Sequence, residues 1–109
     1  MNLKLIATPE FKKSVKKLAK RYKQISKDLK SLEEELTQNS RAGIDLGDNC
    51  FKIRLQNSSV PTGKSGGFRV IYFFRQEDNI YLLDMYSKSD LDNIDEKKLV
   101  EILVSNGLE

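Results

Sequence analysis

The sequence predicts an α+β fold in which helices cover one face of a mostly antiparallel, four-stranded sheet. Two observations support this class. Apolar residues recur at helical spacing through the first third of the chain, and after Gly47 the spacing changes to two, which is typical of strands. The chain has 109 residues and no internal repeat or linker. We therefore expect a single domain, residues 1–109, with the element order β-α-α-β-β-β-α.

The first third should contain a short strand followed by helices. Residues 3–7 read as the strand, and Thr8-Pro9-Glu10 supplies a hydroxyl cap, a proline at the first helical position and a carboxylate in the first turn. A continuous apolar face follows, with members three or four residues apart: Phe11, Val15, Leu18, Tyr22, Ile25, Leu29, Leu32 and Leu36. One long helix or two helices fit this face. We favour two, capped again at Ser26, because a small domain must fold its helices back onto a sheet.

The remaining elements are strands and a terminal helix. Apolar and polar residues alternate in residues 51–55, and residues 68–75 and 80–87 read as two more strands. Residues 57–67 read as a loop rich in Ser, Pro and Gly, and residues 76–79 read as a hairpin turn. Apolar positions in residues 91–103 indicate a short C-terminal helix.

The hairpin determines which side chains share a face of the sheet. A turn at residues 76–79 puts Arg75 opposite Ile80 and Arg69 opposite Tyr86, and cross-strand partners point to the same side. The face toward the helices should then carry Phe68, Val70, Tyr72, Phe74, Tyr81, Leu83 and Met85. The open face should carry Lys52, Arg54, Arg69 and Tyr86, with Lys88 just beyond the last strand.

This cationic group points to a phosphate ligand. Three cations on adjacent strands repel one another unless an anion binds between them, and guanidinium groups bind phosphate oxygens in pairs. The net charge is only +3, but residues 1–36 carry ten Lys and Arg against five Asp and Glu, which favours a polyanionic partner. The alternative reading is that these charges only keep an exposed face in water.

Several kinds of chemistry are excluded or disfavoured. The chain has no histidine, so the usual general base, triad member and metal ligand are missing. Gly63-Lys64-Ser65 is not a P-loop, because Ser58 stands where the first glycine is required. We read Glu33-Glu34-Glu35 as solvated helix surface, and Cys50, lacking a histidine to activate it, as a packed residue. We expect no metal, no cofactor, no membrane span and a reducing, cytoplasmic location.

Three segments resemble the RelE/ParE superfamily of bacterial type II toxins: Phe51 to Leu55, Lys64 to Phe73, and Ile80 to Asp90. Upstream, Phe11-Lys12-Lys13, Tyr22 and Asp28-Leu29 fit the helical hairpin of that family, so the resemblance covers roughly residues 3–104. Its most specific part is the run Gly-Phe-Arg-Val-Ile-Tyr from residue 67 to residue 72. The resemblance implies a sheet of the microbial RNase type with a helical hairpin packed on it.

The resemblance also implies an activity and partners. The expected activity is ribosome-dependent, metal-independent cleavage of mRNA in the decoding site, where a ribose 2′-hydroxyl attacks the adjacent phosphate. Arg69 would bind the phosphate, Lys52 and Arg54 would form the basic pair with Lys52 as general base, and Tyr86 or Lys88 would stack on a base or protonate the leaving oxygen. The expected partners are an antitoxin, mRNA and ribosomal RNA, with DNA reached only through the antitoxin. Contacts to RNA are expected from Lys64, Lys12, Lys13 and Lys16.

Two other functions remain open at this point. The gyrase-inhibiting branch of the superfamily shares the fold without cleaving RNA, and residues 99–103 would then form its contact. A basic RNA-binding module that cleaves nothing is the other alternative. The tail after Lys88 contains no Arg, His or Tyr, so the general acid is unassigned. The combination of Lys52, Arg54 and Arg69 favours the nuclease.

Overall fold

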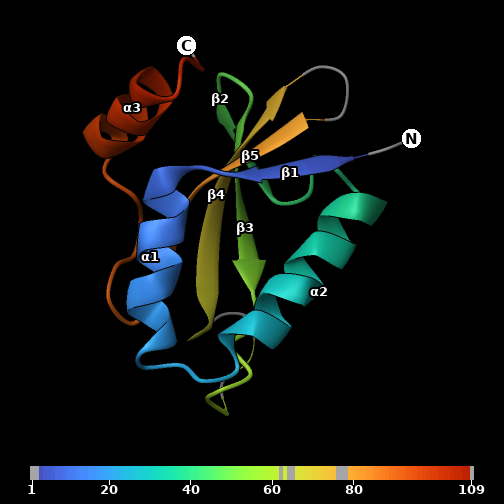
Figure 1. Ribbon diagram of the computed structural model, residues 1–109, viewed down its shortest axis with the longest axis vertical. Coiled ribbons are helices and arrows are strands. Elements are labelled where there is room, and N and C mark those ends of the chain that lie inside the picture. The colour runs from blue at the N-terminus through green and yellow to red at the C-terminus, as the bar shows by residue number, and fades with distance from the viewer. Residues whose placement is uncertain (1–2, 62, 64–65, 76–78, 109) are drawn as a thin grey trace.

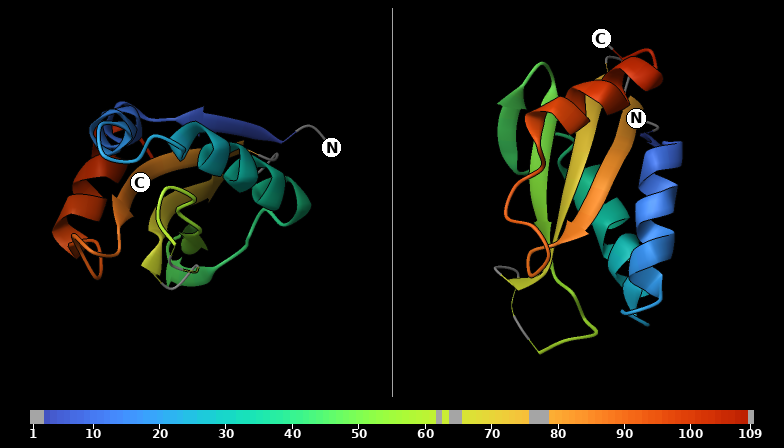
Figure 2. Two further views of the ribbon diagram at one scale, coloured as in Figure 1. Left: turned by 90° about the horizontal axis from the view of Figure 1, so that it is seen from below. Right: turned by 90° about the vertical axis from the view of Figure 1, so that its left-hand side faces the viewer.

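The computed structural model describes residues 3–61, 63, 66–75 and 79–108. Within these residues a five-stranded sheet has the order β1-β5-β4-β3-β2. Helices α1 and α2 pack on one face and α3 on the other (Figures 1 and 2). We call the first the hairpin face and the second the α3 face. The predicted α+β class is confirmed, but the sheet has five strands instead of four, and its helices lie on both faces.

The N-terminal elements begin as the sequence predicts. Strand β1 (Lys4–Ala7) leads directly into α1 (Pro9–Ala19). Thr8 caps the helix, because its hydroxyl accepts a hydrogen bond from the Phe11 amide at 3.2 Å. The same hydroxyl donates to the Leu82 carbonyl at 2.8 Å, which ties the start of α1 to the sheet.

A second helix, α2 (Ile25–Gln38), follows a short turn, so two helices form where one long helix was the alternative. The prediction of Ser26 as its cap is wrong. The helix starts with buried Ile25 at its first position, and Gln24 precedes it without a side-chain cap. Asp28 lies in the first turn, and its carboxylate accepts a hydrogen bond from the Ser58 amide at 3.1 Å. This contact holds the start of the long loop against α2.

The sheet contains one strand that the sequence analysis missed. Strands β3 (Cys50–Leu55), β4 (Phe68–Arg75) and β5 (Asn79–Ser87) form close to their expected bounds, and β1 adds to β5 in parallel. The missed strand, β2 (Ile44–Gly47), pairs antiparallel with β3. All its residues are exposed, so it lacks the alternation by which the others were found. The expected turn after β4 includes residues 76–78, which lie outside the described residues.

The register between β4 and β5 is correct at one end and wrong at the other. Arg69 lies opposite Tyr86 as predicted, but Arg75 pairs with Asn79 instead of Ile80. The reason is a β-bulge, in which Leu83 is the extra residue between the Ile71 and Tyr72 pairs. Because of the bulge, the side chains of residues 80–83 point to the face opposite to the one predicted. Ile80 and Leu82 therefore pack on the hairpin face, whereas Tyr81 and Leu83 pack on the α3 face.

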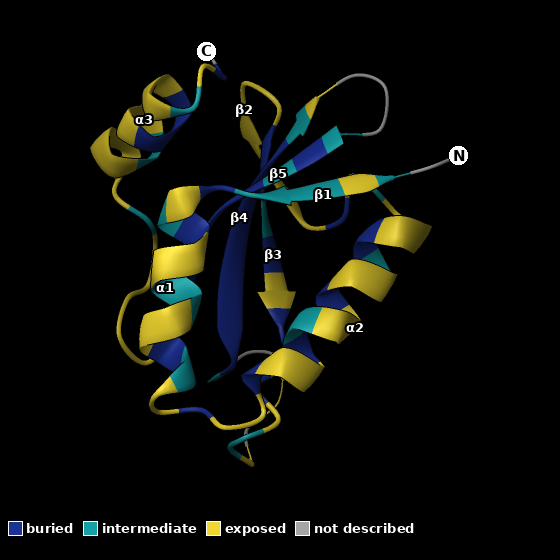
Figure 3. Ribbon diagram, in the orientation of Figure 1, coloured by how far each residue is buried: buried dark blue, intermediate teal, exposed yellow. Residues whose placement is uncertain are grey.

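The C-terminal helix α3 (Glu96–Ser105) starts later than the predicted residue 91, at a cap formed by Asp95. It covers part of the face that was expected to be open, and its Ile102 and Leu103 pack with Leu83 and Tyr86 of β5. As a result β4 is buried along most of its length (Figure 3). In the described parts of the chain, no helix is both long and apolar enough to cross a membrane.

Buried Asp84 connects the two faces. It is 2% exposed, and its carboxylate accepts a hydrogen bond from the Ser14 hydroxyl of α1 at 2.6 Å. On the other side the Lys98 ammonium of α3 lies 3.4 Å from it. A buried carboxylate needs such partners to offset its lost hydration.

Candidate functional site

Four of the five predicted catalytic side chains line one cavity of about 470 Å³: Lys52, Arg54, Arg69 and Lys88. The cavity lies on the α3 face and extends past the edge of β3 to the start of β2 and to α2. Its remaining lining residues are Glu35, Gly43, Ile44, Ile53, Asp92 and Asn93. The fifth predicted residue, Tyr86, is the cross-strand partner of Arg69 and lies beside this lining.

Two arginines face each other at the centre of the site. Arg54 on β3 pairs directly with Arg69 on β4, so the two side chains leave the sheet on the same side. Arg69 is only 5% exposed, and its Nη1 donates to the Phe68 carbonyl at 3.2 Å, whereas Arg54 is exposed. Like charges opposite one another destabilise a sheet. An anion bound between them would remove this repulsion.

The loop after β5 places polar residues against two of the cations. Lys88 forms an ion pair with Asp92 at 2.7 Å, and the Lys52 ammonium donates to the Asn93 side-chain oxygen at 2.8 Å. The Lys88 amide also donates to the Gly67 carbonyl at 2.9 Å, which fixes the start of the loop beside β4. The hydrogen bond from Lys88 lowers the pKa of the Asp92 carboxyl. Asp92 thus acts as an internal counterion at the cavity.

Tyr86 is held below the surface beside Arg69. It is 7% exposed, and no hydrogen bond of ordinary geometry reaches its hydroxyl from the described residues. Burial raises the pKa of the phenol, while the backbone amide of Ile94 and the charge of Arg69 offset part of this effect. The hydroxyl therefore keeps its proton at neutral pH. Its ring packs in the apolar cluster under α3, which makes stacking on a nucleobase impossible without a movement of that cluster.

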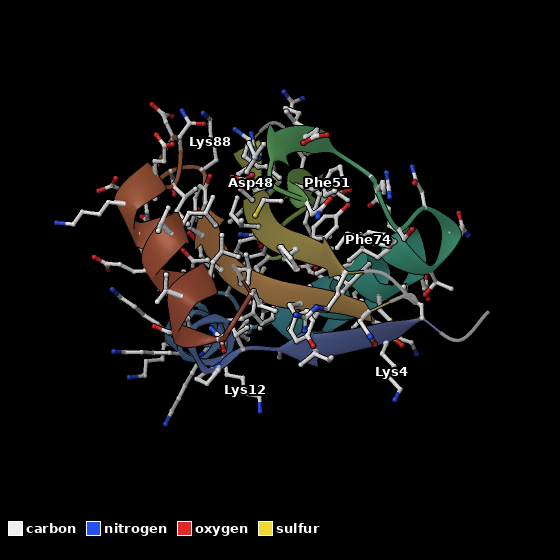
Figure 4. All side chains as sticks on the ribbon, turned by 90° about the horizontal axis from the view of Figure 1, so that it is seen from above. Lys4, Lys12, Asp48, Phe51, Phe74 and Lys88 are labelled. Atoms are coloured by element: carbon white, nitrogen blue, oxygen red, sulfur yellow. The ribbon has the colours of Figure 1, made fainter. Side chains whose placement is uncertain are left out.

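Three of the four lysines expected to contact RNA lie outside the cavity. Lys12, Lys13 and Lys16 are exposed on α1, which packs on the hairpin face. Figure 4 shows Lys12 and Lys88 on opposite sides of the molecule. Lys64 lies outside the described residues. The structure therefore does not bring the three lysines of α1 into the cavity.

Cys50 is packed in the apolar cluster under α3 and is 1% exposed. Burial raises the pKa of its thiol to about 11, so the thiolate is scarce at neutral pH. This environment fits the expected packing role rather than that of a nucleophile.

The cavity also contains residues that the sequence analysis missed. Glu35, taken as solvated together with its two neighbours, is half-buried and lines the cavity, whereas Glu33 and Glu34 are exposed. The available signal was its place three residues after Leu32 and one before Leu36, at the border of the apolar face. Asp92 and Asn93 carried no comparable signal, because they were assigned to a helix that starts later.

These features define a class, a small α+β protein with a cationic cavity suited to a phosphate group. The family model described as "RelE toxin of RelE / RelB toxin-antitoxin system" matches residues 7–105. A solved structure of a double arginine-to-alanine mutant of E. coli toxin RelE in the free state is similar, with a TM-score of 0.60. It is 17% identical in sequence, over 96% of this chain and 98% of that chain. No curated protein matches the chain.

The chain therefore belongs to the RelE toxin family. The resemblance carried by residues 51–55, 64–73 and 80–90 is confirmed at the level of family and fold. Family membership makes the protein the toxin of a toxin–antitoxin pair and implies a cognate antitoxin as its partner.

Proposed function

We propose that this toxin is a ribosome-dependent endoribonuclease that cleaves mRNA without a metal ion. The observation that carries the proposal is the convergence of four cations, Lys52, Arg54, Arg69 and Lys88, around one cavity. Such a group matches the charge that builds up on a phosphate during transesterification, and fixed charges are effective there because they need no reorganisation.

In the proposed reaction the ribose 2′-oxygen forms a bond to the adjacent phosphorus, and the bond from phosphorus to the 5′-oxygen breaks. The products are a 2′,3′-cyclic phosphate and a 5′-hydroxyl. Arg69, nearly buried and held by the Phe68 carbonyl, would stabilise the pentacoordinate phosphate, with Arg54 opposite it. The 2′-hydroxyl proton would pass to Lys52 as the general base, and Asn93 orients its Nζ.

The leaving 5′-oxygen needs a proton. Lys88 is half-buried and lines the cavity, whereas the Tyr86 hydroxyl is buried beside it. We therefore assign Lys88 as the general acid and Tyr86 as a positioning residue for Arg69, its cross-strand partner. This assignment fills the role that the sequence left open.

Binding to the ribosome would use surfaces outside the cavity. The exposed lysines of α1, Lys12, Lys13 and Lys16, present charge for ribosomal RNA, and Lys64 is proposed to join them. The mRNA would enter the cavity in the decoding site, and contact with DNA would occur only through the antitoxin. The proposal places the protein in the cytoplasm, where mRNA is translated.

The test is controlled expression in cells whose mRNAs are mapped for new 5′ ends. Wild type should stop growth and cut within translated codons, and Arg69→Ala should do neither. Arg75→Ala is the matched control, since it removes an exposed arginine from the other end of the same strand. Growth arrest without cuts, or cuts that persist in Arg69→Ala, would refute the proposal.

The gyrase-inhibiting alternative is less well supported by the geometry. Its expected contact, residues 99–103, contains Ile102 and Leu103, which are 3% and 9% exposed and pack against the sheet. Only Val100, at 51%, offers a large apolar side chain to a partner within this segment. A supercoiling assay with purified gyrase should show no inhibition.

A further inference from the structure

The cavity has two chemically different parts. One part holds the four cations, and the other is formed by Glu35 from α2 and by Gly43 and Ile44 at the start of β2. A phosphate group needs only the cationic part, and the Glu35 carboxylate repels it. The second part therefore suits a neutral group joined to the phosphate.

Glu35 carries the negative charge of this second part. The helix buries its neighbours Leu32 and Leu36 at 1% and 0% exposure, so Glu35 lies at the border of the packed face and is half-buried. Among the described residues it forms no ion pair, although Arg54 lines the same cavity. Its charge reaches inward: after burial, Glu35 is the second cause of the raised pKa of Tyr72.

The wall beside Glu35 is apolar and tightly built. Gly43 has a φ of 97°, and a Cβ on it would collide with the Lys52 carbonyl, so only glycine lets the chain pass this close over β3. The next residue, Ile44, is 54% exposed and lines the cavity. An exposed aliphatic side chain beside a carboxylate offers a contact surface for a flat ring and an acceptor for its edge.

We propose that Glu35 reads the nucleobase next to the scissile phosphate and prefers guanine, with Ile44 against the ring. This inference rests on the proposed function and adds a specificity-determining residue to it. Guanine presents two adjacent N–H donors, N1–H and the exocyclic amine, which match the two oxygens of one carboxylate. In uracil the single N–H lies between two carbonyls, and in cytosine and adenine the amine lies beside a ring acceptor, so each sets a lone pair against the carboxylate.

The experiment compares wild type with Glu35→Gln and the matched control Glu34→Gln, the exposed neighbour on the same helix. The first readout is the base composition around mapped cuts in cellular mRNA. The second is calorimetric binding of guanosine 3′-monophosphate and uridine 3′-monophosphate to the purified proteins. A bidentate base contact is worth enough for the guanine preference of wild type to fall about fivefold or more in Glu35→Gln. Glu34→Gln should keep the wild-type preference.

The outcomes separate this inference from the proposed function. Cuts with the same base preference in wild type and Glu35→Gln would overturn the role of Glu35 and leave the nuclease intact. If no variant cuts RNA, the mononucleotide titrations still decide: a guanine preference that depends on Glu35 supports the base site, and equal binding of both nucleotides overturns it. Glu35→Asp, which keeps the charge, should retain part of the preference, and thermal melting of each variant checks that it folds.

Discussion

The two faces of the sheet bury different kinds of side chain. On the hairpin face, Leu32, Leu36, Phe68 and Tyr72 are at most 1% exposed and form a continuous apolar core with α1 and α2. On the α3 face, apolar packing is interrupted by buried groups that prefer water, above all Arg69 at 5% exposure. The first face therefore supplies most of the apolar packing, and the second holds charged side chains around the cavity.

The largest effect should come from the hairpin face. Leu36→Ala removes a side chain with no exposed surface, which should lower the free energy of unfolding by about 2–5 kcal/mol. Chemical denaturation measures this change. Val100→Ala, at a position 51% exposed, is the control and should change stability by no more than about 0.5 kcal/mol. Equal losses in both variants would contradict the comparison.

Arg69→Ala should sharpen the comparison by separating activity from stability. Loss of one preorganised donor to the transition state should lower the cleavage rate on translated mRNA about 10²- to 10³-fold. Stability should fall far less than in Leu36→Ala, because the change also removes the repulsion with Arg54. A cleavage assay in a translating extract, paired with thermal melting, gives both values. A variant that is unfolded would contradict this division between the faces.

The α3 face should also limit stability at alkaline pH. The pKa of Cys50 rises from its ordinary value of 9.0 to about 11 on folding, so between these values the unfolded chain has lost a proton that the folded chain keeps. Stability is therefore unaffected by this group below pH 9 and falls as the pH rises toward 11. Denaturation at pH 8 to 10.5 should show a shallower decline in Cys50→Ala. An unchanged slope would mean that Cys50 does not contribute.

The smallest effect concerns the internal counterion. Asp92→Ala frees Lys88 from its acidic partner and should tighten the binding of inorganic phosphate less than about fivefold, because the pair is exposed. Isothermal titration with phosphate measures this. Glu101→Ala removes another exposed carboxylate, one that does not line the cavity, and should leave binding unchanged. Weaker binding in Asp92→Ala would show that Asp92 supports the cavity instead of competing with phosphate.

Much of the fold followed from periodicity. Both helices of the hairpin and the strand β3 bury one face more strongly than the other, which leaves a spacing that is visible in the sequence, whereas β4 and β5 are buried along most of their length and appear as apolar runs. Strand β2 buries nothing and left no such spacing. The bulge at Leu83 could not be seen either, because Leu83 is apolar and fits a strand in any register. Its burial depends on contacts with α3, which are far away in the sequence.

The candidate site was predicted in part for the same reason. Lys52, Arg54 and Arg69 were found because alternation places them on one face, and Arg69 lies on the side of the bulge where the register is unaffected. Glu35 and Asn93 were missed because they reach the cavity from a helix border and from a loop, where tertiary packing alone decides direction. Sequence patterns therefore predict the charged residues of the sheet better than the polar residues that a helix border or a loop adds to the cavity.

The facing arginines Arg54 and Arg69 have a consequence for the history of such sequences. Selection for folding alone does not require two arginines to face each other, whereas the proposed phosphate site does. Loss of one arginine would leave the hairpin core and the fold intact. The presence of both in a related chain would then mark a lineage in which the toxin still acts, and the loss of one would mark a protein kept only as a scaffold for its antitoxin.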